Sequence, residues 1–284
     1  MNQYDIVITS CKKDQKVLQL CINSIKKYIN GYRRIIVVSN EKLTDIENVE
    51  WFDEKKYPFS KKDLYDQMYN VVPDSLRRKR LGYINQLLKL YAHYIIPDLT
   101  ENILIIDSDI IFIKESSFFD YKYNQTTKNN ELIPKYGYNY MYPNGWDFYQ
   151  NHFKKLHPTF NDFNKSGICH HIIYNKHIIN EIFNLIEKHH NQTFWKIYLN
   201  LMDTRPNEIH SEPANCELYF NYISKFHKDK FILRLIKWLE SPAVGGQNNR
   251  INSDESIFQT QKEKALKENC NYIAFHSYDR DETF

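Results

Sequence analysis

The sequence has few glycines, no paired cysteines and no long apolar run. Only 7 of its 284 residues are glycine, and neither G-x-G-x-x-G nor G-x-x-x-x-G-K-[ST] occurs. The scarcity of glycine therefore argues against a site that holds phosphates in a glycine-rich loop. The five cysteines are scattered and lack C-x-x-C spacing, so we predict reduced thiols rather than disulfides or a zinc site.

No apolar stretch approaches the roughly 20 residues that span a bilayer. No basic start with a long apolar run precedes the first strand-like segment, so we expect no signal peptide and a cytoplasmic protein. The net charge of +3 gives no support for nucleic-acid binding. The one dense basic run, 77–80, is either a solvated approach to a helix or a site for phosphate or an acidic membrane surface.

Apolar segments alternate with helical patterns through residue 113. Buried strands are predicted at 5–9, 34–38 and 103–106, with a fourth segment at 110–113, and helices at 14–28 and between Gly82 and Pro97. Strands that are apolar throughout and alternate with helices indicate a mostly parallel α/β sheet covered on both faces. We predict a single α/β domain over 1–284, with a central sheet flanked by helices.

The hydrophobic periodicity is less regular in the second half of the chain. Residues 121–165 are predicted to form long loops with short strands, and helices are predicted at 176–189, 217–226 and 229–239. A short apolar strand covers 272–275 and ends at His276.

Polar residues follow three of the predicted strands: Thr9, Ser10, Ser39, Asn40, Asp107, Ser108 and Asp109. The carboxyl ends of parallel strands meet at one edge of a sheet, where ligands bind. Asp107 and Asp109 leave a strand of four aliphatic residues with two carboxylates free to converge on Mg²⁺ or Mn²⁺. The alternative is a polar turn after a core strand.

The helix after Gly82 places Gln86, Lys89 and His93 on one face. The lysine could meet a phosphate, and the glutamine could bond a sugar or a carboxylate. The alternative is that this polar face lies in solvent. On either interpretation the apolar face of the helix, which includes Tyr94, is predicted to point inward.

The block 82–113 resembles bacterial and viral GT-A glycosyltransferases. Those proteins carry a G-[WY]-x-x-Q-x-x-K-L helix followed by four hydrophobic residues and D-x-D, as Gly82–Leu90 and 103–109 do here. Asn85 stands where relatives often have a second glutamine. The resemblance covers about the first 115 residues well, and implies a nucleotide-sugar-binding half (1–113), an acceptor-binding half (114–284) and a GT-A-like, Rossmann-like fold.

The resemblance also implies roles for single residues. Asp107 and Asp109 would engage Mn²⁺ or Mg²⁺ and the donor phosphates, with His276 as a third metal ligand. The nucleotide-sugar donor, with a UDP-sugar favoured, would lie near Thr9 and Ser10. Residues 216–222 look like the family's S-E-x-E-[LI]-Y segment, in which Glu217 matches the second acid and Asn215 replaces the first if no gap is allowed.

Two acids are candidates either for the general base that deprotonates an acceptor hydroxyl or for the group that orients the acceptor by hydrogen bonds: Glu217, and Glu212 as a displaced equivalent of the first acid. The alternative for Glu212 is a plain helix start, in which Ser211 precedes Glu212 and Pro213. Residues 164–171 resemble the acceptor-side strand of the same enzymes, so His170 or His171 would line the site, with Asp162 nearby. Trp146 is a candidate for stacking on a sugar.

The predicted function is metal-dependent transfer of a sugar from a nucleotide-sugar to a hydroxyl of a glycan, lipid or protein. A non-catalytic module that binds nucleotides or glycans is the first alternative. A haloacid-dehalogenase-type phosphatase shares the D-x-D setting, but usually carries it on the first strand and needs a later acidic pair. Here the motif begins at residue 107, after two strands, and no Asp-Asp pair follows it. Contact with a membrane would be peripheral.

Overall fold

A computed structural model describes residues 3–77, 79–125, 128–138, 147–160, 166–201, 214–241 and 255–275. The strands are β1 Tyr4–Thr9, β2 Tyr32–Ser39, β3 Val49–Asp53, β4 Asn102–Asp107, β5 Ile110–Phe112, β6 Phe119–Asn124, β7 Asn129–Gly137, β8 His171–Asn175, β9 Ile232–Arg234, β10 Trp238–Ser241 and β11 Tyr272–Phe275. The α-helices are α1 Gln15–Tyr28, α2 Lys61–Gln67, α3 Asp74–Arg77, α4 Tyr83–Ile95, α5 Asp147–Leu156, α6 Lys176–His190, α7 Phe194–Asn200, α8 Asn215–Phe226 and α10 Glu255–Lys267. Short 3-10 helices cover Lys12–Asp14, Glu54–Lys56, Met68–Asn70 and Lys79–Gly82.

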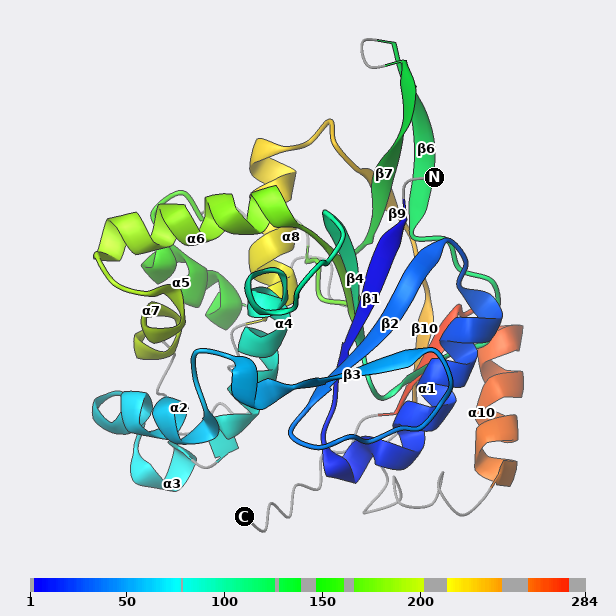
Figure 1. The fold of residues 1–284 in the computed structure, drawn as a ribbon, viewed down its shortest axis with the longest axis horizontal. Helices are drawn as coiled ribbons and strands as arrows, with labels where there is room; N and C mark the ends of the chain where they lie inside the picture. Colours follow the sequence, from blue (N-terminus) through cyan, green and yellow to red (C-terminus); the bar gives the residue numbers. More distant parts are fainter. Residues whose placement is uncertain are drawn as a thin grey trace.

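The centre of the fold is a five-stranded sheet in the order β3-β2-β1-β4-β8 (Figure 1). β1 pairs in parallel with β2 and β4, and β2 with β3, whereas β8 is antiparallel to β4. The predicted α/β class with a mostly parallel sheet flanked by helices is confirmed. β3 lies in a segment for which no strand was predicted, and β8 comes from the second half of the chain, so the two halves share this sheet.

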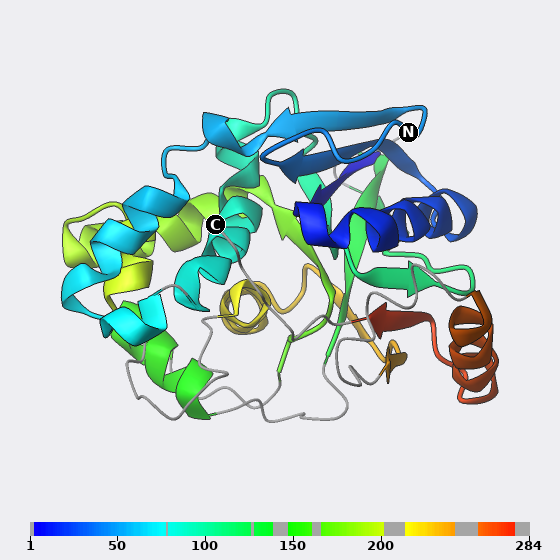
Figure 2. The ribbon, with the colours of Figure 1, turned by 90° about the horizontal axis from the view of Figure 1, so that it is seen from below.

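Helices cover both faces of the sheet (Figures 1 and 2). α4 packs on β1, and α6 and α8 pack on β8, while α1 packs on β5 at the other side. α1 buries a stripe of apolar side chains at helical spacing, formed by Leu18, Cys21, Ile22 and Ile25. This is the stripe on which its prediction rested.

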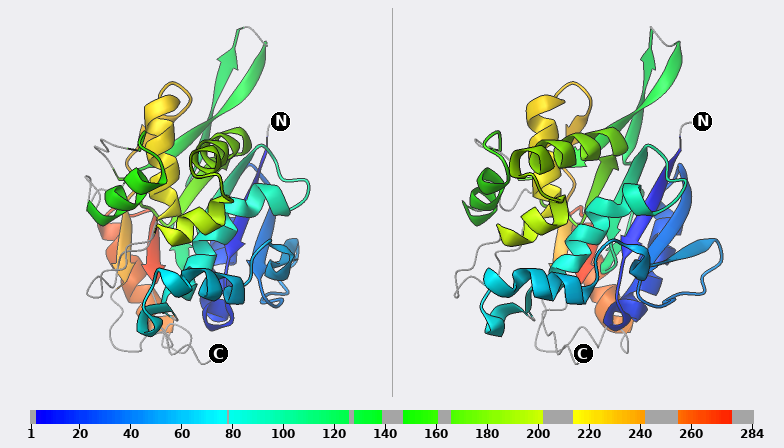
Figure 3. Two further views of the ribbon diagram at one scale, coloured as in Figure 1. Left: turned by 90° about the vertical axis from the view of Figure 1, so that its left-hand side faces the viewer. Right: turned by 60° about the vertical axis from the view of Figure 1, so that its left-hand side comes forward.

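Two smaller sheets complete the fold. β10, β11 and β5 form one, in which β11 is parallel to β10 and antiparallel to β5. β6, β7 and β9 form the other, and its β6–β7 hairpin projects from the body of the molecule (Figures 1 and 3). The strand predicted at 272–275 is confirmed as β11.

The second half departs from the prediction in several places. The helix predicted at 229–239 is wrong, because this segment contains β9 and the start of β10. Within 121–165 the short strands are confirmed, but α5 was not predicted. Tyr94 was placed on the inward side of its helix and is instead 48% exposed.

Local signals account for the helix ends that were predicted well. α4 stops at Ile95, since Ile96 precedes a proline and adopts an extended conformation. α6 begins after Asn175, whose side chain accepts hydrogen bonds from two backbone N–H groups of the first turn, and ends at Asn191 in the left-handed conformation. All five cysteines are free, as predicted. No helix in the described part of the chain has the length and apolar character needed to cross a membrane.

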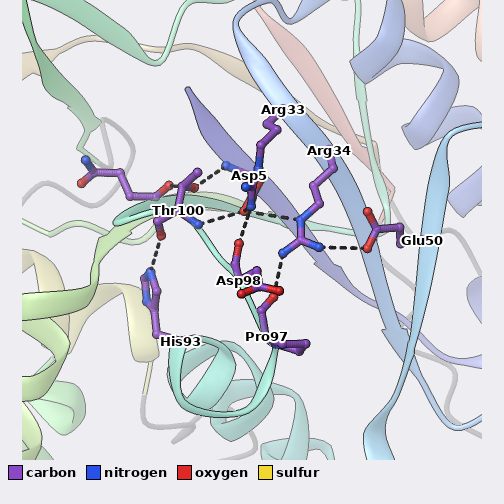
Figure 4. A network of polar contacts seen from close by, with 9 residues as sticks. Asp5, Arg33, Arg34, Glu50, His93, Pro97, Asp98 and Thr100 are labelled. Carbon is purple, nitrogen blue, oxygen red and sulfur yellow. Dashed lines mark hydrogen bonds and ion pairs between the residues drawn. The ribbon is translucent and has the colours of Figure 1, made fainter. Parts of the chain in front are cut away.

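Figure 4 shows a polar network that fixes the amino edge of the central sheet. The fully buried Asp5 carboxylate accepts from Nε and Nη2 of Arg33 at 2.9 and 2.7 Å and from the backbone N–H of Thr100 at 2.9 Å. Arg34 lies 3.6 Å from the same carboxylate and pairs with Glu50. The buried charge is therefore paired and hydrogen-bonded, which ties the starts of β1 and β2 to the turn before β4.

Candidate functional site

The candidate site lies at the carboxyl edge of the central sheet. Thr9, the last residue of β1, is in register with Val38 of β2 and with Asp107 of β4. The predicted convergence of Thr9, Ser10 and Asp107 at one edge is therefore confirmed. Asn40 follows β2 at this edge and is exposed.

Two hydroxyls at this edge are buried without a partner. Thr9 Oγ1 and Ser10 Oγ have no hydrogen-bond partner within the described residues. Buried polar groups are almost always hydrogen-bonded. These two hydroxyls therefore mark a place for a polar ligand atom or a water, where the sequence predicts a nucleotide contact.

Asp107 lies between a lysine and a histidine. Lys89 of α4 donates to Oδ1 of Asp107, and Nδ1 of His170 lies 3.5 Å from Oδ2. The Lys89 side chain is only 5% exposed and that of Asp107 28%. The backbone N–H of Asp107 also donates to the carbonyl of His170 at 2.9 Å, so the segment before β8 meets the end of β4 through two contacts.

The charges of this pair reinforce each other. Burial alone raises the pKa of Asp107, but the ammonium of Lys89 and the ring of His170 outweigh it and hold that pKa well below its ordinary value. Burial lowers the pKa of Lys89, yet the charges of Asp107 and Asp109 raise it overall. An ionised carboxylate and a protonated lysine therefore face each other at neutral pH.

The polar face of α4 turns inward, so the alternative of a solvent-facing stripe is wrong. Lys89 reaches Asp107, as described. Gln86 Oε1 accepts from the N–H of Asn215 at 3.1 Å and so caps the first turn of α8. His93 Nε2 lies 3.3 Å from the carbonyl oxygen of Thr100, near the amino edge. Lys89 thus contacts the D-x-D segment, and the donor contact of Gln86 remains a prediction.

The described residues supply two candidate metal ligands. Ser108 is buried, and Asp109 is half-buried, with its carbonyl accepting the N–H of Phe275 at 2.8 Å. Asp107 and Asp109 provide oxygen donors of the kind that Mn²⁺ and Mg²⁺ prefer, and in this respect they fit such an ion. Within the described ranges, no group of three or more His, Cys, Asp or Glu is arranged to hold a metal. His276 lies outside the described residues, so its role remains a prediction.

Glu217 anchors a loop beside the site. It is 1% exposed, and its Oε2 accepts from the N–H of Gly167 at 2.6 Å and from Oγ of Ser166 at 3.1 Å. Its carboxylate thus holds the segment that leads to His170. Glu212, the other candidate base, lies outside the described residues, as do Trp146 and Asp162.

The adjacent histidines have different environments. His171 is buried and packs edge-on against Phe118 with ring centroids 5.0 Å apart, and burial lowers its pKa to about 3. His171 is therefore a neutral core residue. His170 faces Asp107, in keeping with the alternation of side chains along a strand.

Sequence reasoning missed Glu240 and Trp238. Glu240 Oε1 lies 3.3 Å from Nε2 of His170 and accepts from Nε1 of Trp238 at 2.7 Å. Both residues belong to β10, within and next to the segment predicted to be helical. β10 has only four residues, which is too few for an alternation of apolar and polar side chains to be recognised in the sequence.

Part of the basic run 77–80 is structural. The Arg77 side chain is buried, pairs with Asp74 at 2.5 Å and lies over the rings of Tyr65 and Tyr69. For this residue the interpretation as a solvated approach to a helix is wrong.

A large hollow in the described part of the chain lies away from these residues. It measures about 1250 Å³ and opens at the amino edge of the sheet, where Gln3, Asn102 and Asn175 line it together with the β6–β7 hairpin. None of the predicted site residues lines it.

No protein-family model and no curated protein matches the sequence. Solved structures do match over nearly the whole chain. Mouse xyloside xylosyltransferase 1 in its apo form is 10% identical with a TM-score of 0.44, covering 98% of this chain and 99% of that one. An active-site mutant of LgtC is 10% identical with a TM-score of 0.45, covering 99% and 91%. The apo WbbM bifunctional glycosyltransferase is 12% identical with a TM-score of 0.45, covering 98% of this chain and 46% of that one. Structural similarities at this low sequence identity and TM-score carry no information on the donor, the acceptor or catalysis.

Proposed function

We propose that this protein is a glycosyltransferase that moves a sugar from a nucleotide-sugar, a UDP-sugar in the first instance, to a hydroxyl of a glycan, lipid or protein acceptor. The observation that supports this most is the carboxyl edge of the sheet. Asp107 ends β4 there and Asp109 follows two residues later, and Asp107 lies beside the unpartnered hydroxyls of Thr9 and Ser10 and the buried ammonium of Lys89. Such an edge combines anionic groups for a cation with donors for phosphate oxygens.

In this proposal Asp107 and Asp109 hold Mn²⁺ or Mg²⁺, which when bound supplies positive charge to stabilise the departing nucleoside diphosphate. Lys89 adds a second cation on the same side. Because it is buried and ion-paired, it is already oriented before the donor arrives, and preorganised charge of this kind is an effective source of transition-state stabilisation. The hydroxyls of Thr9 and Ser10 contact the nucleotide.

The acceptor hydroxyl needs a base, and two acids are candidates. Glu217 is in contact with Ser166 and Gly167 and is 1% exposed, so it would need this loop to move before it could reach an acceptor. We therefore propose Glu217 as the residue that holds the loop next to His170, and keep Glu212 as the other candidate for the base.

A non-catalytic nucleotide-binding module is the second candidate. One observation favours it: both oxygens of Asp107 already have partners, in Lys89 and His170. A carboxylate so engaged could serve only to orient Lys89 toward a phosphate.

Thermal-shift measurements with UDP, GDP and CMP, each with and without Mn²⁺, test the donor site. A ligand present at 100 times its Kd and bound only to the folded state adds about 2.7 kcal/mol of stability. We expect UDP with Mn²⁺ to raise the Tm of the wild type and to have little effect on Asp109→Ala. Glu263→Ala, on the exposed surface of α10, is the matched control for loss of one carboxylate.

Hydrolysis or transfer of a UDP-sugar by the stabilised protein then distinguishes the two candidates. Turnover supports the transferase, and binding without turnover of any sugar-nucleotide supports the module. If none of the nucleotides shifts the Tm under any condition, both candidates fail.

A further inference from the structure

A chain of polar side chains links the two sheets that meet at the candidate site. Trp238 Nε1 donates to Glu240 Oε1 at 2.7 Å, and that same oxygen lies 3.3 Å from Nε2 of His170. Nδ1 of His170 lies 3.5 Å from Oδ2 of Asp107. β10 thereby contacts the end of β4 through one imidazole ring.

The ring of His170 is held by its surroundings as well as by these contacts. It packs edge-on against Trp238, with ring centroids 5.5 Å apart, and against Tyr272 at 5.8 Å. Trp238 and Tyr272 themselves stack nearly parallel, at 5.7 Å and 7°. With its side chain only 13% exposed, His170 has little freedom to turn, so its two nitrogens stay directed at the two carboxylates.

Each oxygen of Asp107 therefore has its own partner. Lys89 holds Oδ1 from α4, and His170 holds Oδ2 from the segment before β8. Glu240 contacts the nitrogen of His170 opposite to the one that faces Asp107. A partner on the far nitrogen fixes the orientation of a histidine and raises its strength as a donor or ligand.

We infer that Glu240, oriented by Trp238, is a positioning residue of the donor site: it acts through His170 to fix the carboxylate of Asp107. The inference rests on the proposed function, because it assigns a role within the same nucleotide-sugar site. It predicts that Glu240 governs nucleotide affinity without touching the nucleotide.

The test uses full-length variants that keep the shape of each side chain. In Glu240→Gln the amide oxygen can still accept from Trp238, but the charge facing His170 is lost. In His170→Phe the ring remains between Trp238 and Tyr272, but both nitrogens are lost. The Kd of UDP is measured by calorimetry with Mn²⁺ present, and the Tm of each unliganded variant is compared with that of the wild type.

Loss of a residue that orients a metal-binding residue typically lowers metal affinity or activity by roughly 10- to 100-fold. We expect Glu240→Gln to raise the Kd of UDP about tenfold while the Tm of the unliganded protein changes by little. In the His170→Phe background the same substitution should have no further effect, because the residue through which it acts is gone. Glu263→Gln should leave the Kd unchanged.

Three other outcomes have clear meanings. If Glu240→Gln weakens binding equally in the wild-type and His170→Phe backgrounds, Glu240 acts on the ligand itself and the inference is overturned. If it leaves the Kd unchanged while the wild type binds UDP, the donor site stands and only the inference fails. If the wild type binds none of UDP, GDP and CMP, the proposed function fails and the positioning role with it.

Discussion

Glu217 makes the stability of the protein depend on pH. Its carboxyl group lies in the first turn of α8 with 1% exposure, facing Ser166 and Gly167. Burial raises the pKa of Glu217 from 4.5 to about 7, against the opposing effect of its hydrogen bonds. The folded protein therefore holds this proton more tightly than the unfolded chain does.

The sign and size follow by linkage. A group whose pKa is raised in the folded state contributes stability that is fully present below the unfolded pKa of 4.5 and is lost as pH rises through about 7. The two pKa values differ by roughly 2.5, and each pH unit is worth about 1.36 kcal/mol, so the contribution is about 3 kcal/mol. Glu217→Gln removes the titration and leaves an amide oxygen that can accept from Gly167.

Urea denaturation at pH 4.5, 6, 7 and 8 measures this contribution. We expect Glu217→Gln to match the wild type within about 1 kcal/mol at pH 4.5 and to exceed it by about 3 kcal/mol at pH 8, since other titrating groups cancel in the difference. Glu263→Gln, on the exposed face of α10, should show no such trend. A difference between Glu217→Gln and the wild type that stays constant from pH 4.5 to 8 would refute the reasoning.

Two further predictions concern residues around the site. Lys89→Met leaves the carboxylate of Asp107 without its ammonium, and we expect the free energy of unfolding to fall by about 2 kcal/mol at pH 7. This is less than the full cost of breaking a buried ion pair, because Asp107 is 28% exposed. Adding Asp107→Asn should restore more than half of that loss in urea denaturation, and a simple sum of the two single effects would contradict the ion pair. Gly167→Ala places a methyl group 2.2 Å from Cβ of Phe220, so we expect about 2 kcal/mol of destabilisation, and a change below about 0.5 kcal/mol would contradict the close packing of this loop on α8.

Glu217 and Lys89 also bear on the proposed chemistry. Glu217→Gln is expected to retain the loop next to His170, so a loss of turnover at pH 6 without any drop in Tm would point to catalysis by Glu217 rather than by Glu212. Lys89→Met should weaken nucleotide binding in the calorimetric assay, since it removes a cation from the phosphate side of the proposed site.

The sequence by itself determined the elements whose signals are local. β1, β2 and β4 are continuous apolar runs, and α1, α4, α6 and α8 have helical apolar spacing, with caps or a following proline at several ends. It also predicted that Thr9, Ser10 and Asp107 lie at one edge, because the carboxyl ends of parallel strands lie at the same edge of a sheet. The structure makes them neighbours there, since β1 pairs with β4.

Only the tertiary structure decided which polar residues face inward. The spacing of Gln86, Lys89 and His93 predicts one face of a helix, but whether that face meets solvent or a buried carboxylate depends on the packing of α4 against β1 and α8. The roles of His170 and Glu240 depend on the meeting of β4 with β10, which come from distant parts of the chain. A strand as short as β10 is stabilised by its pairing with β11. Its own residues carry too weak a pattern to predict a strand, and the first half of it was predicted as part of a helix. Periodicity is a property of neighbours in sequence, whereas the contacts of this site are made between residues that only folding brings together.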